Sequence, residues 1–193
     1  MSSETRSYSQ TQRAESMAAT RRAILGAAVA LFRDEGEHDP SLEQVAARAG
    51  CSTRSVIRHF GSKEGLFEAA MADTMEAVVE SRRVVPGDVD GCVRLLVDHY
   101  ERMGDDVVRW LGSTERYPLV RRVIDEGERM HRELIAEAFE PDLSSLDRAE
   151  RRRRLATLAT VTDVYVWHLL RRREGLGRDA AEAEIRNLVE RAR

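Results

Sequence analysis

Hydrogen-bonding side chains gather between Thr53 and His59, and no acidic residue lies among them. The five residues that carry this pattern are Thr53, Arg54, Ser55, Arg58 and His59. Arginine can bond guanine through two nitrogens in the DNA major groove, and Ser and Thr hydroxyls can bond several base edges. This set of side chains therefore predicts sequence-specific recognition of DNA.

Two short helices joined by a tight turn must present these side chains. Ser41 can cap the first helix and Gln44 completes a capping box, while Gly50 ends it with the positive φ that this position favours. Ser52 can cap the second helix, whose inward side includes Val56. Small residues at the turn allow a steep crossing, so the segment is predicted to be a helix-turn-helix whose second helix enters the major groove.

The composition favours helices and places the basic charge at one end of the chain. Charged residues make up 34% of the 193 residues and aromatic residues 5%, which predicts an all-α fold. Residues 1–63 hold nine basic and seven acidic side chains, a net charge of +2, which leaves −5 for the remainder of the total of −3. This distribution favours local DNA contact by the N-terminal part.

Several other protein classes are excluded by the sequence. No apolar run approaches about 18 residues and the N-terminus lacks the apolar core of a signal peptide, so a cytoplasmic protein without membrane contact is expected. Cys51 and Cys92 form neither a disulfide framework nor a metal-site spacing, and packing is the expected role of Cys51. The histidines lack the close spacing of a zinc site, so neither a metal nor a cofactor is expected.

The hydrophobic pattern divides the chain into three segments. These are a disordered polar arm at residues 1–12, a helix-turn-helix domain at 13–63 and a helical domain at 64–193. A long helix from Ser62 is expected to join the two domains, because its apolar stripe exceeds what the small domain can cover. The other helices are expected over 20–35, 89–103, 106–111, 118–140, 147–173 and 179–192, with a stop at Gly104.

The segment from Leu155 to Leu170 is apolar on nearly every side. Such a helix either lies at the centre of a large bundle or faces both its own core and a partner subunit, and the size of this half favours the second arrangement. A homodimer is therefore predicted, and the flanking arginine runs 151–154 and 171–173 are predicted to be solvated. The expected interface residues are Leu158, Val161, Tyr165, Leu169, Ile185, Leu188 and Val189.

The stretch from Ala23 to Leu66, with LEQVAARAGCSTRSVIRHFGSKEGL at its centre, resembles the N-terminal DNA-binding domain of the TetR family of bacterial transcription regulators. The helix lengths, the AxxAG turn, Phe60 and the SKEG start of the next helix carry this resemblance. It implies an all-helical homodimer that binds a pseudo-palindromic operator in double-stranded DNA. It also implies a small-molecule pocket, which makes residues 64–193 an effector-binding and dimerisation domain.

By position, the resemblance assigns phosphate contacts to Ser41, Ser52 and Lys63. One position departs from the family, because many members carry a DNA-contacting Tyr where this chain has Ile57. Ile57 cannot donate a hydrogen bond to a phosphate, so the tyrosine contact is either missing here or replaced by an apolar one, for example to a thymine methyl group.

The side chains that could line an effector pocket are large or half-polar and lie on helices that must converge. They are His99, Tyr100, Met103, Trp110, Met130, Tyr165 and Trp167. Each of them also suits a core or interface position, but together they predict an apolar effector with one or two hydrogen-bonding groups.

An enzyme is not expected, because the sequence contains no glycine-rich phosphate loop, no GxSxG elbow, no HExxH and no paired-carboxylate motif. The predicted function is a transcriptional repressor that is released from DNA by its effector. An activator remains open as an alternative. A helical adaptor that contacts protein through the helix-turn-helix is also open, although a basic face without acids argues against it.

Overall fold

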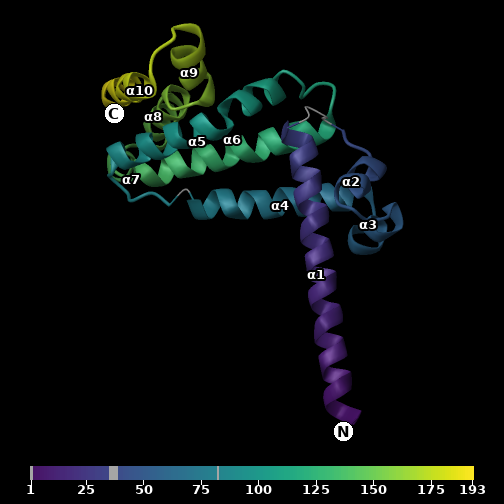
Figure 1. Ribbon diagram of the computed structural model, residues 1–193. Coiled ribbons are helices and arrows are strands. Elements are labelled where there is room, and N and C mark those ends of the chain that lie inside the picture. Colours follow the sequence, from purple (N-terminus) through teal and green to yellow (C-terminus); the bar gives the residue numbers. More distant parts are fainter. Residues whose placement is uncertain (1, 35–38, 82) are drawn as a thin grey trace. The chain divides into compact units, whose positions relative to one another are not determined.

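The protein is built from helices, and the part that the structure describes contains no strand (Figure 1). The computed structural model describes the backbone of residues 2–34, 39–81 and 83–193, and the side chains of residues 12, 15–33, 39–74 and 83–193. The chain divides into two compact units, Met1–Val78 and Val79–Arg193. The predicted all-α fold is confirmed, and the division between the two units falls within a helix.

The helices of the first unit are α1 (Ser2–Asp34), α2 (Leu42–Arg48), α3 (Thr53–Phe60) and α4 (Lys63–Ser81), of which α4 continues to the start of the second unit. The expected start of the first helix at Thr20 is wrong, because α1 begins at Ser2. No proline or glycine precedes Gly26, so nothing in residues 2–25 interrupts a helix. The residues predicted to form a disordered arm thus belong to α1 from Ser2 onward. The end predicted for this helix, residue 35, lies outside the described residues.

All four helices of the first unit carry buried apolar side chains. They include Leu25, Leu31, Phe32, Val45, Ala46 and Val56, together with Leu66 and Phe67 from α4. Phe60 is only half-buried, and the guanidinium of Arg21 lies 5.1 Å from the centre of its ring. Three further apolar residues of α4, which belong to the apolar stripe expected of the helix from Ser62, are Met75, Val78 and Val79, and their side chains lie outside the described part.

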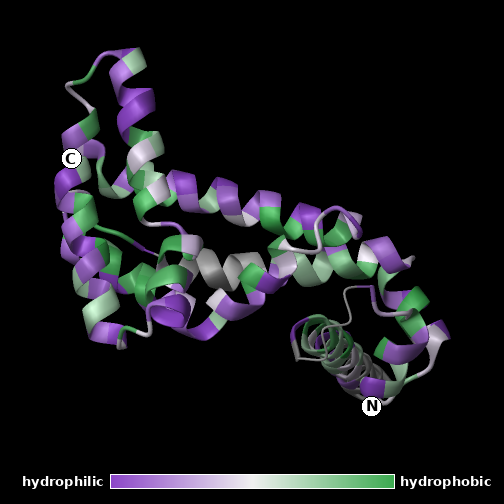
Figure 2. Ribbon diagram, turned by 90° about the horizontal axis from the view of Figure 1, so that it is seen from above, coloured by the Kyte–Doolittle hydropathy of each residue, from purple (hydrophilic) through white to green (hydrophobic). Residues whose placement is uncertain are grey.

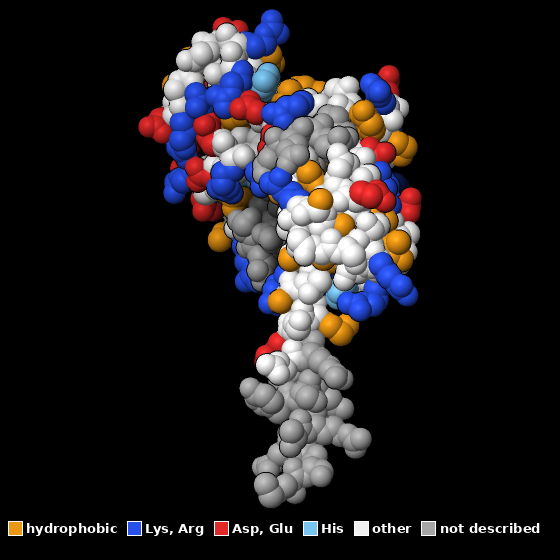
Figure 3. Space-filling view, turned by 45° about the vertical axis from the view of Figure 1, so that its right-hand side comes forward, with side chains coloured by type: hydrophobic (Ala, Val, Ile, Leu, Met, Phe, Trp, Pro, Cys, Tyr) orange, Lys and Arg blue, Asp and Glu red, His pale blue; other side chains and the backbone are white. Residues whose placement is uncertain are grey.

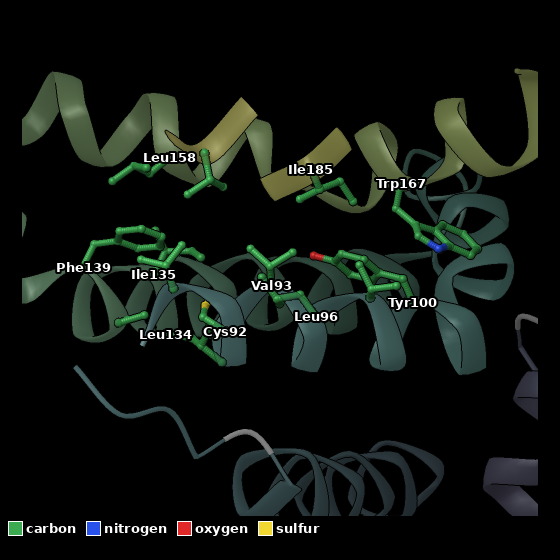
Figure 4. Close-up of a cluster of buried hydrophobic side chains, with 14 of the residues drawn as sticks. Cys92, Val93, Leu96, Tyr100, Leu134, Ile135, Phe139, Leu158, Trp167 and Ile185 are labelled. Carbon is green, nitrogen blue, oxygen red and sulfur yellow. The ribbon is translucent and has the colours of Figure 1, made fainter. Parts of the chain in front are cut away.

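The second unit contains α5 (Val89–Leu111), α6 (Pro118–Ala138), α7 (Glu140–Leu143), α8 (Arg148–Val161), α9 (Val164–His168), the π-helical turn η1 (Leu169–Arg173) and α10 (Arg178–Ala192). α5 packs against α6, α9 and α10. Leu158 and Ile185 project from the upper layer of helices toward Phe139 and Val93 in the lower layer, and Trp167 lies near Tyr100 (Figure 4). Along the longer helices hydrophobic and hydrophilic residues alternate, as expected of helices with one buried face (Figure 2).

Gly104 does not end a helix. α5 continues through it to Leu111, so the predicted stop at residue 104 and the separate helix over 106–111 are wrong. Gly104 is buried against the indole of Trp167, and a Cβ at this position would lie 2.7 Å from Cε3 and 2.8 Å from Cη2 of that ring. The glycine is therefore explained by a close approach between α5 and α9.

The predicted helix from Asp147 to Arg173 is also interrupted. Asp147 caps α8, since its Oδ1 accepts hydrogen bonds from two amides of the first turn. However, α8 ends at Val161, and Asp163 caps the next helix by accepting a hydrogen bond from the Tyr165 amide at 2.8 Å. The last helix, α10, begins at Arg178 after Gly177 and not at the expected residue 179.

Cys92 packs in the core of the second unit and is 1% exposed. Burial raises the pKa of its thiol to about 12, so the side chain stays protonated and behaves as a small apolar group.

Candidate nucleic-acid interface

The turn between α2 and α3 is held by local hydrogen bonds that the sequence predicts. Ser41 Oγ accepts from the Gln44 amide at 3.2 Å, and Gln44 Oε1 accepts from the Ser41 amide at 2.6 Å, which completes the capping box. Gly50 takes φ of 65°, and Ser52 Oγ accepts from the Ser55 amide at 3.2 Å. Both cap hydroxyls act as acceptors, so each keeps its O–H to donate to a phosphate.

The two sides of α3 differ sharply in exposure. Val56 is 0% exposed and fixes the helix on the core, whereas Arg54 and Arg58 are exposed. The other residues predicted to contact DNA, Thr53, Ser55 and His59, are half-buried. No acidic residue occurs in α3. The helix therefore presents two guanidinium groups and several hydrogen-bonding groups from a fixed base, which suits contact with base edges.

Lys63 lies in the first turn of α4 and has a partner that the sequence did not indicate. Its Nζ is 2.6 Å from Asp39 Oδ1 and donates to the Asp39 carbonyl oxygen at 3.2 Å. Ser62 caps this helix, as its Oγ accepts from the Gly65 amide at 3.1 Å. The ammonium group predicted to contact a phosphate is thus engaged by an aspartate, which must give way if Lys63 binds DNA.

Replacing this partner, Asp39→Asn, is expected to raise DNA affinity about two- to fivefold for operator and random DNA alike. An exposed ion pair is worth roughly 0–1 kcal/mol, which is the amount that breaking the Lys63 pair would cost on binding. Fluorescence anisotropy with labelled duplexes would measure the change. Glu43→Gln is the matched control, because it removes one exposed acid from the same unit without freeing Lys63. An equal gain in affinity in both variants, or a loss of affinity in Asp39→Asn, would contradict the idea that Lys63 leaves Asp39 to bind a phosphate.

Comparisons with known proteins agree with this geometry. Residues 24–70, which include α2 and α3, match the family model of bacterial regulatory proteins, tetR family. The HTH-type transcriptional regulator BetI of Escherichia coli (strain UMN026 / ExPEC) is 32% identical over 83 residues, 40% of this chain and 43% of the relative. BetI of Escherichia coli (strain 55989 / EAEC) is 40% identical over 53 residues, 28% of this chain and 27% of the relative. The matches therefore span less than half the length of these relatives.

A solved structure shows the same fold along most of the chain. It is the crystal structure of a transcriptional regulator from Rhodococcus sp. Rha1, with a TM-score of 0.64 and 15% sequence identity. The alignment covers 89% of this chain and 95% of that chain. The helix-turn-helix of this chain is therefore similar to the N-terminal domain of the tetR family of bacterial regulatory proteins.

Two of the predicted effector-binding side chains meet in the core of the second unit. The ring centres of Tyr100 and Trp167 are 6.1 Å apart, and the ring centres of His99 and Tyr100 are 5.8 Å apart. Tyr100 donates to the Thr162 carbonyl oxygen at 3.0 Å, and Trp167 Nε1 donates to Glu101 Oε1 at 2.8 Å. The polar atoms of Tyr100 and Trp167 are therefore used within the chain.

The remaining effector candidates differ in exposure. Trp110 and Met130 are buried, Met103 is half-buried, and Tyr165 is 50% exposed. Tyr165 thus lies on the surface, apart from the buried pair formed by Tyr100 and Trp167. Effector binding by this set stays a prediction.

In the second arginine run, Arg172 and Arg173 are exposed, as predicted, and Arg171 is half-buried, but two of the guanidinium groups are paired with acids. Arg171 donates to both carboxylate oxygens of Glu101, at 2.6 and 2.9 Å, and this hydrogen bonding lowers the pKa of Glu101. Arg172 pairs with Asp105 at 2.8 Å and lies 5.0 Å from the Trp167 ring centre. On the face drawn in Figure 3, basic and acidic side chains lie intermixed. The run therefore ties η1 to α5 through Arg171 and Arg172.

The residues predicted to form a dimer interface divide into buried and exposed sets. Leu158, Ile185 and Val189 are at most 2% exposed and line the chain's own core, so they offer no surface to a partner. Tyr165 and Leu169 are 50% and 43% exposed. The two others, Val161 and Leu188, are half-buried. The apolar surface outside the core is thus narrower than the sequence predicts.

Among the described helices none is long and apolar enough to cross a membrane.

Proposed function

We propose that this protein is a TetR-family regulator, that it represses transcription as a homodimer on a pseudo-palindromic operator, and that a small, largely apolar effector releases it. The observation that carries the proposal is α3, a capped helix fixed by the buried Val56 and presenting the exposed Arg54 and Arg58 without an acid. The protein acts in this scheme through binding and not through catalysis. Its place is the bacterial cytoplasm, where the operator DNA lies.

Base recognition and phosphate contact are assigned to different side chains. Arg54 and Arg58 bond guanines, each contact being worth about 1–3 kcal/mol of discrimination. Thr53, Ser55 and His59 bond neighbouring base edges. Phosphate contacts from Ser41, Ser52 and Lys63 fix the orientation of the domain on the duplex and carry no sequence information.

The dimer gives the operator its symmetry. Two copies of α3 must lie about 34–36 Å apart to reach successive turns of the major groove. The surface proposed to join the subunits centres on Tyr165 and Leu169, with Val161 and Leu188 at its margin. Val161 lies in α8, Tyr165 in α9, Leu169 in η1 and Leu188 in α10, and all four side chains are partly exposed.

Release requires that the effector bind one conformation better than the other. A pocket among the helices of the second unit would serve this purpose, with the Tyr100 and Trp167 region as the proposed location. The chain passes from the DNA-binding unit to the second unit through α4, so α4 is the element proposed to transmit the change.

Selection of bound DNA from a random pool tests the proposal. The expected result is a pseudo-palindrome whose half-sites are centred about one helical turn apart, or a multiple of it, with guanine fixed in each half. Enrichment of an unrepeated site would contradict dimeric binding, and no enrichment at all would contradict DNA recognition. A thermal-shift screen on the same protein, followed by competition with operator binding, would then test release by effectors.

A further inference from the structure

Ile57 is a large apolar side chain that α3 leaves exposed. It is 48% exposed, while the other apolar residues of α3 are covered, Val56 completely and Phe60 in part beneath Arg21. Arg54 lies one helical turn before Ile57 and Arg58 directly follows it, and both are exposed. Ile57 therefore accompanies the two guanidinium groups on the accessible part of this helix.

Folding does not account for an isoleucine at this position. A side chain that keeps about half its surface in water gains little from burial, and a β-branched residue is a weaker helix former than alanine. α3 is already fixed by its Ser52 cap and by Val56. The Ile57 side chain thus offers an apolar contact that the free protein does not use.

The DNA major groove contains one apolar group that can meet such a side chain. Base edges present donors and acceptors there, and only thymine adds a methyl group, at C5. We infer that Ile57 is a specificity-determining residue that packs on the C5-methyl group of a thymine in each half-site, beside the bases that Arg54 and Arg58 contact. The inference rests on the proposed function, because it requires α3 to enter the major groove.

Deoxyuridine gives a direct test, because uracil keeps the hydrogen-bonding pattern of thymine and lacks only its methyl group. Each thymine of the selected operator is replaced in turn, and affinity is measured by anisotropy for the wild-type protein and for Ile57→Ala. One position per half-site is expected to weaken wild-type binding about fourfold, the effect of losing one buried methyl group. The same replacement is expected to change binding by Ile57→Ala very little.

Val85→Ala is the matched control, because Val85 is another exposed β-branched residue, at 66%, and lies in the second unit. It should keep the wild-type response to uracil, and both variants should melt at the wild-type temperature. Binding of wild-type protein that is indifferent to uracil, or an equal uracil effect in Ile57→Ala, would overturn the thymine contact alone. Failure of the wild-type protein to select any DNA would instead overturn the proposed function.

Discussion

Raising the salt concentration from about 50 to about 200 mM is expected to weaken operator binding about 10³- to 10⁵-fold. This range corresponds to 6–10 phosphates neutralised by lysine and arginine, each of which releases a condensed counterion from the duplex. The first unit offers enough such groups apart from the base-reading arginines, since Arg21, Arg22, Arg48 and Lys63 are exposed or half-buried, and a dimer doubles the set. Affinities measured by anisotropy at several salt concentrations would give the slope of log K against log salt.

Two single substitutions separate the kinds of contact behind this slope. Lys63→Ala should reduce the slope by about 1 for each phosphate that is no longer neutralised, and it should weaken binding to all sequences about equally. Arg58→Ala should reduce the preference for operator over random DNA by about 1–3 kcal/mol per half-site. An affinity independent of salt would contradict DNA binding. An equal fall in preference for both variants would contradict the division between base and phosphate contacts.

The local features of the candidate site can be predicted from sequence because their causes are local. The capping pair Ser41 and Gln44 and the cap from Ser52 join residues three apart, and Gly50 alone accounts for its positive φ. Short-range rules of this kind depend little on the rest of the fold. The interaction of Lys63 with Asp39, 24 residues apart, lies beyond them.

The second unit is harder to predict because its helix ends depend on distant contacts. A glycine in a helical pattern either stops the helix or admits a close neighbour, and Trp167 decides between these outcomes at Gly104. The pair of Arg171 and Glu101 spans 70 residues and gives no local signal. By contrast, the break before α9 has a signal in the sequence, because Asp163 is of a type that caps helices. The apolar residues on both sides of Asp163 obscure this signal.

Hydrophobicity on several sides of a helix does not show which core covers each side. The sequence predicts that Leu158, Ile185 and Val189 face a partner, yet they are buried within the chain. The helix break after Val161 changes the direction of the side chains that follow. The buried side of these residues therefore cannot be predicted from one continuous helical period. Exposure of Tyr165 and Leu169 is what remains to support the proposed dimer.

Gly104→Ala is expected to destabilise the second unit by about 3 kcal/mol, at the upper end of the usual cost of overpacking. The added methyl group would overlap the indole of Trp167, which is 0% exposed and is held further by its hydrogen bond to Glu101. Urea denaturation followed by tryptophan fluorescence would measure the change in the free energy of unfolding.

The same substitution at Gly127 in α6 is the control, because a Cβ there would meet nothing within 4 Å. Gly127→Ala should stabilise the protein by up to about 1 kcal/mol, since alanine is the better helix former. Adding Trp167→Phe to Gly104→Ala should recover part of the stability, because the smaller ring makes room for the methyl group, and the coupling of the two changes would measure the overlap. Equal effects at Gly104 and Gly127, or additive effects of the Gly104 and Trp167 changes, would contradict the close approach of α5 and α9 as the reason for this glycine.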